Sequence, residues 1–152
     1  MSFVCEICKV NPNSHSLKNI YETDKIIVYY TCPSEGKNNE LEGIKHHFNG
    51  TLSEIKDKKW IWILDLKEFG LDNLFRLNNF IELSKIITGK YGSNLEKIIL
   101  INENIYTRVI YDIFKSALSK RMSSIINFLD DSDKNASLNE KLTKIINKNK
   151  HF

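Results

Sequence analysis

The sequence predicts a single α/β domain, in which a mostly parallel β-sheet is flanked by helices. Residues 59–66, Lys-Trp-Ile-Trp-Ile-Leu-Asp-Leu, form a run that is apolar on both faces of a strand, as in a sheet covered on both sides. Four strand candidates alternate with four helix candidates, and the strands begin roughly 25 to 40 residues apart. This spacing is typical of parallel strands joined by crossover helices.

The strand candidates are residues 25–30, 59–66, 96–102 and 122–129. The first three are rich in Ile, Val, Leu and aromatic residues, as buried strands are. The fourth is less purely apolar, because it contains Ser123, Ser124 and Asn127. We therefore expect four parallel strands, of which residues 59–66 form a central one.

The helix candidates are residues 39–55, 72–91, 106–119 and 137–147. In the first, apolar residues recur at steps of three and four, which indicates an amphipathic helix. Gly50 weakens this helix, since an interior glycine costs about 1 kcal/mol relative to alanine. In the second, the apolar residues cover more than one stripe, so we expect it to be buried, and Gly92 is a natural stop.

The length of 152 residues suits one domain with a single sizeable core. We expect an irregular N-terminal segment at 1–20 and the α/β domain at 21–152. With 41% hydrophobic and 27% charged residues, the composition is that of an ordinary globular protein. No stretch is long and uncharged enough to span a membrane, and we see no signal-peptide core. Three cysteines without a secretion signal then predict a reduced, cytoplasmic protein.

The net charge of +3 comes from the C-terminal quarter, where eight Lys or Arg residues from position 115 onward face four acidic residues. Such a segment could make transient contact with an anionic membrane surface. We favour the simpler interpretation of a solvated helix face and expect no nucleic-acid partner.

Several catalytic signatures are absent from the sequence, including the Gly-x-Gly-x-x-Gly and Walker loops and the Gly-x-Ser-x-Gly elbow. Ligands of open α/β sheets bind beyond the carboxyl ends of the strands. Asp65 and Asn102 occupy such positions, as do Asp130 and Asp131 after the last strand candidate. We expect Asp65 and Asn102 to shape turns and cap helices, and we predict no catalytic residue.

The pair Cys5-x-x-Cys8 has the spacing with which two thiolates chelate Zn²⁺ from one turn. A structural zinc site needs four ligands. The candidates for the remaining two are Cys32, His15, His46 and His47, and none of them completes a second recognisable pair. Two interpretations stay open, a zinc site with further ligands unknown and two reduced thiols near a terminus.

Residues 5–29 also resemble the opening of histidine-triad nucleotide hydrolases, in which Cys-x-x-Cys precedes a Tyr-Glu-x-Asp turn, here at 21–24. The catalytic run of alternating histidines is missing, and His46-His47 does not replace it. A zinc-supported nucleotide-binding protein is therefore kept only as a minor alternative.

A broader resemblance begins at Trp-Ile-Leu-Asp-Leu-Lys, residues 62–67, and continues through a long helix, Tyr-Gly-Ser-Asn-Leu-Glu-Lys-Ile and Ile-Asn to residue 102. With the helix 106–119 and the strand that follows, this order resembles the CRAL-TRIO lipid-binding family. The chain departs from the family pattern at Gly92 and Glu103, where prolines are usual. It therefore resembles a short, divergent member.

The resemblance implies a non-enzymatic module that binds a small lipophile or lipid in an apolar pocket, without a cofactor. The sheet would be the floor, and the helix 106–119 would close the cavity. The expected pocket residues are Tyr106, Val109, Ile110, Ile113, Phe114, Ala117 and Leu118, with Phe80, Leu83 and Ile87 on another wall. The alternative is a protein-interaction or regulatory module with a collapsed pocket. This alternative predicts an exposed apolar patch on the helix and a loss of partner capture in Phe114→Asp.

Overall fold

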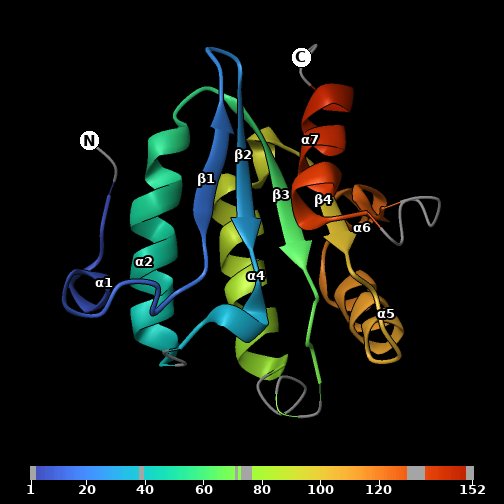
Figure 1. The fold of residues 1–152 in the computed structure, drawn as a ribbon, viewed down its shortest axis with the longest axis horizontal. Helices are drawn as coiled ribbons and strands as arrows, with labels where there is room; N and C mark the ends of the chain where they lie inside the picture. Colours follow the sequence, from blue (N-terminus) through green and yellow to red (C-terminus); the bar gives the residue numbers. More distant parts are fainter. Residues whose placement is uncertain (1–2, 38–39, 71, 73–76, 130–135, 150–152) are drawn as a thin grey trace.

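Five strands form one sheet in the order β1-β2-β3-β4-β5 (Figure 1). The computed structural model describes residues 3–37, 40–70, 72, 77–129 and 136–149. The strands are β1 (Lys18–Glu22), β2 (Ile26–Thr31), β3 (Lys59–Asp65), β4 (Leu95–Ile101) and β5 (Ile126–Phe128). β1 runs antiparallel to β2, and the other neighbouring pairs are parallel. The predicted fold class is therefore confirmed.

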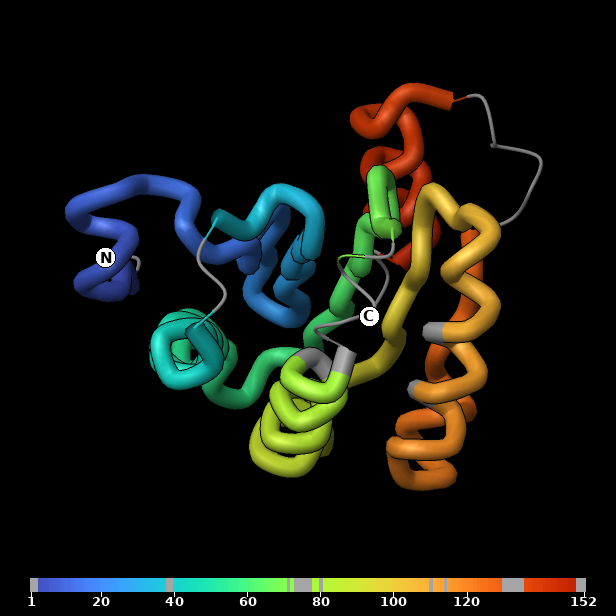
Figure 2. The backbone as a smooth tube through the Cα atoms, turned by 90° about the horizontal axis from the view of Figure 1, so that it is seen from below, coloured from blue at the N-terminus to red at the C-terminus, as the bar shows by residue number. Residues whose placement is uncertain are grey.

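Helices cover both faces of this sheet. They are α1 (Glu6–Val10), α2 (Leu41–Leu52), α4 (Leu77–Tyr91), α5 (Thr107–Ala117), α6 (Lys120–Ser124) and α7 (Leu138–Asn149), with 3-10 turns η1 (Pro33–Glu35), η2 (Ser53–Ile55) and η3 (Gly92–Asn94). Figure 2 shows α2 and α4 side by side on one face and α7 on the opposite face. The beginning of the predicted helix 72–91 falls partly outside the described residues.

The central strand β3 divides the core into two layers. Trp60, Trp62 and Leu64 point into the cluster shared with α2 and α4, whereas Ile61 and Ile63 point into the cluster shared with α7. This alternation follows from the two-residue period of a strand. Burial on both faces explains why the run 59–66 contains no exposed polar position after its first residue.

Two predicted segments differ in the structure. Residues 122–129 form β5 only over three residues, because Ser119 caps the short helix α6 by accepting a hydrogen bond from the backbone N–H of Met122. The segment 1–20, expected to be irregular, contains α1 and the start of β1. The polar edge strand β1 is held by its hairpin with β2, in which Thr23 Oγ1 accepts from the N–H of Ile26 at 3.1 Å.

Candidate functional site

Four metal-ligating side chains converge beside α2 at the β1 side of the molecule. They are Cys5, Cys8, His15 and His47, and their ligand atoms all lie within 4.8 Å of one another. Cys5 caps α1 and Cys8 lies within it, His15 precedes β1, and His47 lies on α2. The fold thus brings together a local pair of thiols and two histidines that come from different elements.

The distances within this cluster are short and uniform. The Nδ1 atom of His15 lies 3.4 Å from the sulfur of Cys5 and 3.7 Å from that of Cys8. The Nδ1 atom of His47 lies at the same two distances, 3.4 Å from Cys5 and 3.7 Å from Cys8. Each imidazole therefore directs the same ring nitrogen at both sulfur atoms.

The cluster is closed to solvent, with exposed fractions of 2% at Cys5, 9% at Cys8, 4% at His15 and 7% at His47. Burial raises the pKa of the Cys5 thiol. Burial also lowers the pKa of both imidazoles, an effect that the carbonyl of Leu17 partly offsets at His47. The two histidines are therefore held neutral near pH 7, with a lone pair on one nitrogen of each ring.

Hydrogen bonding determines which ring nitrogen of His47 carries the lone pair. The Nε2 atom of His47 lies 3.4 Å from the carbonyl oxygen of Leu17, to which it donates, so its Nδ1 carries the lone pair. The Nε2 atom of His15 is buried and has no hydrogen-bond partner among the described residues. It faces Gly43, where an added Cβ would lie 3.6 Å away.

The other two ligand candidates lie elsewhere. Cys32 follows β2, and its sulfur lies 3.2 Å from the hydroxyl of Ser34. His46 is exposed and meets the ring of Phe3 edge-on. The helical period distinguishes the two neighbouring histidines. His47 comes three residues after Ile44 and lies on the apolar face of the helix, whereas His46 does not.

The predicted pocket residues occupy different depths. Leu83 and Ile87 of α4 are buried in the core, and Tyr106 and Leu118 are half-buried against that same cluster. Ile113 and Ala117 are half-buried, and Val109 is 47% exposed. The side chains of Phe80, Ile110 and Phe114 lie outside what the structure describes. Tyr111, which the prediction left out, also packs on this core and lies with its ring 4.9 Å from that of Phe128.

A buried polar network joins the carboxyl ends of the parallel strands. Asp65 is fully buried and accepts hydrogen bonds from the hydroxyl of Tyr30 at 2.5 Å, the backbone N–H of Lys67 at 3.0 Å and the amide of Asn102 at 2.8 Å. The ammonium of Lys141 in turn donates to the amide oxygen of Asn102. Asp65 and Asn102 thus stabilise the turns after β3 and β4, which is the turn role that the sequence predicts; the predicted helix capping by these two residues is not seen among the described residues.

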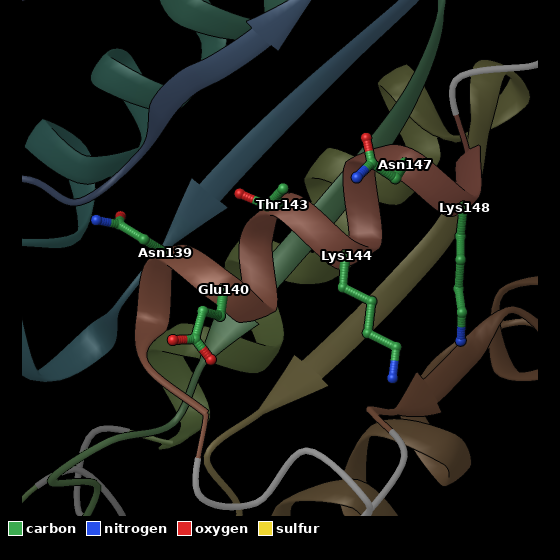
Figure 3. A pocket seen from close by; sticks show the side chains of 6 residues that line it. All are labelled: Asn139, Glu140, Thr143, Lys144, Asn147 and Lys148. Atoms are coloured by element: carbon green, nitrogen blue, oxygen red, sulfur yellow. The ribbon is translucent and has the colours of Figure 1, made fainter.

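Lys141 departs from the expected solvated helix face, because it is only 7% exposed. The outer face of α7 carries a shallow hollow (Figure 3). It is lined by Asn139, Glu140, Thr143, Lys144, Asn147 and Lys148. A second hollow lies beside α1 and is lined by Glu6, Ile7, Val10, Asn11, Ser14 and Lys37. The first hollow lies on α7 and the second beside α1, so neither is lined by the predicted pocket residues of α4 and α5. In the part of the chain that is described, no helix has the length and apolarity needed to cross a membrane.

Comparison with known proteins agrees with this architecture. The CRAL/TRIO domain family matches residues 37–150. Among solved structures, the crystal structure of Sfh5 superposes with a TM-score of 0.64 at 15% sequence identity, over 87% of this chain and 51% of that one. The chain thus spans about half the length of Sfh5, and the likeness concerns the fold alone. No curated protein matches the sequence.

The fold and the match together define an α/β module with a parallel sheet and helices on both faces. The chain belongs to the CRAL/TRIO domain family, as its sequence predicts. Proteins of this family generally bind lipids. They generally have no cofactor and are generally not enzymes.

Proposed function

We propose that this chain is a non-enzymatic module that binds a small lipophilic ligand between α4 and α5. Family membership over residues 37–150 carries the proposal. The arrangement of apolar side chains on these two helices supports it. α4 and α5 contact each other, and both contribute to the cluster that covers one face of the sheet.

The proposed site has a buried base and a partly exposed wall. Leu83 and Ile87 form the base on α4, with exposed fractions of 3% and 2%. Tyr106, Ile113 and Leu118 on the side of α5 are only half-buried. A lipophile that covered the remaining apolar surface would be stabilised by about 25 cal/mol per Å² removed from water. An apolar wall that is incompletely buried is therefore a suitable place for ligand contact.

The polar groups nearest to the carboxyl edge of the sheet serve the fold. Asp65 already accepts three hydrogen bonds and is inaccessible to solvent. Asn102 bridges Asp65 and Lys141. These interactions support a role in binding without acid, base or nucleophilic chemistry.

Native mass spectrometry of the chain purified from its host would test the proposal, together with titration of a fluorescent fatty-acid probe. We expect a bound lipophile and saturable probe binding. Ile113→Asp should weaken probe binding at least tenfold, because it places a charge on the half-buried wall. Ser116→Asp is the matched control, since it adds the same charge at an exposed position of α5.

The protein-interaction alternative has its own support at the start of α5, where Ile105 is 82% and Val109 is 47% exposed. If neither lipid extract nor probe binds, and Val109→Asp abolishes capture of a protein partner, this alternative replaces the proposal. Probe binding that is equal in Ile113→Asp and Ser116→Asp would also contradict the proposed wall.

A further inference from the structure

The Cys/His cluster has a ligand geometry that lipophile binding does not use. We propose that Cys5, Cys8, His15 and His47 bind one Zn²⁺ in a tetrahedral site, which fastens the segment 3–17 to α2. The site lies beside α1 and α2 at the β1 edge of the sheet, whereas the proposed lipophile wall on α5 lies at the opposite edge (Figure 1). The two proposals can therefore fail independently.

The distances fit a single tetrahedral ion. With Zn–S bonds near 2.3 Å and Zn–N bonds near 2.0–2.1 Å, a tetrahedral angle places sulfur and nitrogen ligands about 3.5–3.6 Å apart. The four sulfur–Nδ1 distances are 3.4, 3.7, 3.4 and 3.7 Å and lie on both sides of this value. The four sulfur–nitrogen distances are therefore those that one ion between these atoms requires.

The ligand types and their distances select the metal. Two thiolates and two imidazoles form one of the standard ligand sets of structural Zn²⁺, whereas Mg²⁺ and Ca²⁺ prefer oxygen. A two-iron cluster would hold the thiols on one iron and the imidazoles on the other. Here each imidazole nitrogen is within 3.7 Å of both sulfur atoms, which leaves room for one ion between them.

Groups around the ligands hold them in position. The backbone N–H of Cys8 donates to the sulfur of Cys5 at 3.4 Å, a hydrogen bond that stabilises a thiolate. The carbonyl of Leu17 orients the ring of His47 through its Nε2. Such outer partners are a regular part of metal sites, because they fix the tautomer and the ring direction.

Two glycines of α2 make room for the segment that carries three of the ligands. An added Cβ at Gly43 would lie 2.9 Å from Ile7 and 3.6 Å from the Nε2 of His15, and one at Gly50 would overlap the ring of Phe3. The two glycines are seven residues apart and so lie on the same face of the helix. This face accepts the N-terminal segment along its length, and His47 between them supplies the fourth ligand.

Binding has a definite proton balance. Two neutral imidazoles and two thiols take up one Zn²⁺, two zinc–sulfur bonds form, and the two thiol protons pass to the buffer. The ion retains its oxidation state, so no oxidant or reductant is needed. The product is a closed four-coordinate site with no position for a substrate, which assigns it a structural role.

Elemental analysis of the reduced full-length chain, expressed with zinc and dialysed, should find about one zinc per chain. Titration of the stripped chain with Co²⁺ should give the intense visible bands of tetrahedral cobalt and the charge-transfer band of a thiolate ligand. Cys5→Ser and His47→Gln should each lower zinc affinity at least tenfold. Cys32→Ser is the control, because this third buried cysteine lies outside the cluster and should leave binding unchanged.

Limited proteolysis provides a readout that does not depend on the variants folding. Removal of zinc from the wild-type chain by a chelator should speed cleavage after the exposed Lys9 at least tenfold, while the sheet stays protected. Less than a tenth of one zinc per chain with no tetrahedral cobalt spectrum would overturn the proposal. So would zinc binding that Cys5→Ser and Cys32→Ser affect equally.

Discussion

The ring of Phe3 lies on the surface of α2 that Gly50 leaves open, and a Cβ at position 50 would overlap that ring. The N–H of Phe3 also donates to the carboxylate of Glu54 at 2.5 Å, one turn further along the chain. Gly50 has a low helix propensity, but its missing side chain makes room for the ring of Phe3. The cost in helix propensity is offset by the seating of the N-terminal segment.

Gly50→Ala should therefore lower the free energy of unfolding, by about 1–3 kcal/mol, because the ring must move to admit the methyl group. The matched control is Gly89→Ala in α4, where a Cβ would meet nothing within 4 Å. That substitution should stabilise the protein by about 0.5–1 kcal/mol. Urea denaturation of both variants measures the sign of each change in the free energy of unfolding. Stabilisation by both substitutions would contradict the close approach of the Phe3 ring to Gly50.

The sequence was sufficient for the buried strands and insufficient for the edges of the sheet. β3 and β4 are continuous apolar runs, so their local pattern alone predicts them. β1 reads Lys-Asn-Ile-Tyr-Glu and is half exposed, so only its pairing with β2 identifies it as a strand. α6 has five residues, too few for helical periodicity to be recognised.

The same limit applies to the Cys/His cluster. Cys5 and Cys8 were identified because their spacing is local. His15 and His47 lie ten and 42 residues from Cys5 along the chain, and only the packing of the segment 3–17 against α2 brings them together. Cys32 is closer to Cys5 in sequence than His47 is, and its N–H donates to the hydroxyl of Ser16 at 2.8 Å, yet its sulfur is not part of the cluster. Distance along the sequence therefore does not predict which residues join the cluster.

Tyr30→Phe should cost about 1.5–3 kcal/mol at pH 7, since it removes a hydrogen bond to the buried carboxylate of Asp65. Tyr29→Phe is the control, because its hydroxyl donates to the neutral carbonyl of Thr51 at 3.3 Å and should contribute less. Chemical denaturation at pH 7 compares the two. Equal losses would contradict a special contribution of the Tyr30–Asp65 bond.

The alkaline limit of stability should depend on the same two tyrosines. Burial raises the pKa of both, and at Tyr30 the hydrogen bond to Asp65 raises it further, above the ordinary value of 10. The unfolded chain then loses these protons at a lower pH than the folded chain does. Stability is complete below pH 10 and falls as the pH rises above it. Each Phe variant should fall less steeply between pH 10 and 11 than the wild type.

Arg121 should stabilise the connection between α4 and β4. Its guanidinium donates to the carbonyl of Gly92 at 2.6 Å and to that of Leu95 at 3.1 Å, so it bridges the two ends of η3. Arg121→Lys should lower the free energy of unfolding by about 1 kcal/mol, because an ammonium lacks the fork that reaches both carbonyls. Lys120→Arg, at the exposed neighbouring position, is the control and should stay within about 0.5 kcal/mol of wild type.

The ammonium of Lys141 fastens α7 to the sheet through Asn102 and, beyond it, Asp65. Lys141→Met keeps the apolar stem and removes only the charged donor. We expect a loss of about 1.5–3 kcal/mol, because the amide oxygen of Asn102 loses a charged partner in a buried site. Lys148→Met on the exposed side of α7 should change stability by less than about 0.5 kcal/mol.

Hydrogen exchange distinguishes this anchoring from a general loss of stability. In Lys141→Met the amides of α7 should lose protection to a greater degree than those of β3, since the helix can detach while the sheet remains folded. A uniform loss over both elements would indicate that α7 and the sheet unfold only together. Equal protection in Lys141→Met and Lys148→Met would show that the Lys141–Asn102 bond does not hold the helix. The apolar side chains of α7, among them Leu142, Ile145 and Ile146, would then carry the attachment.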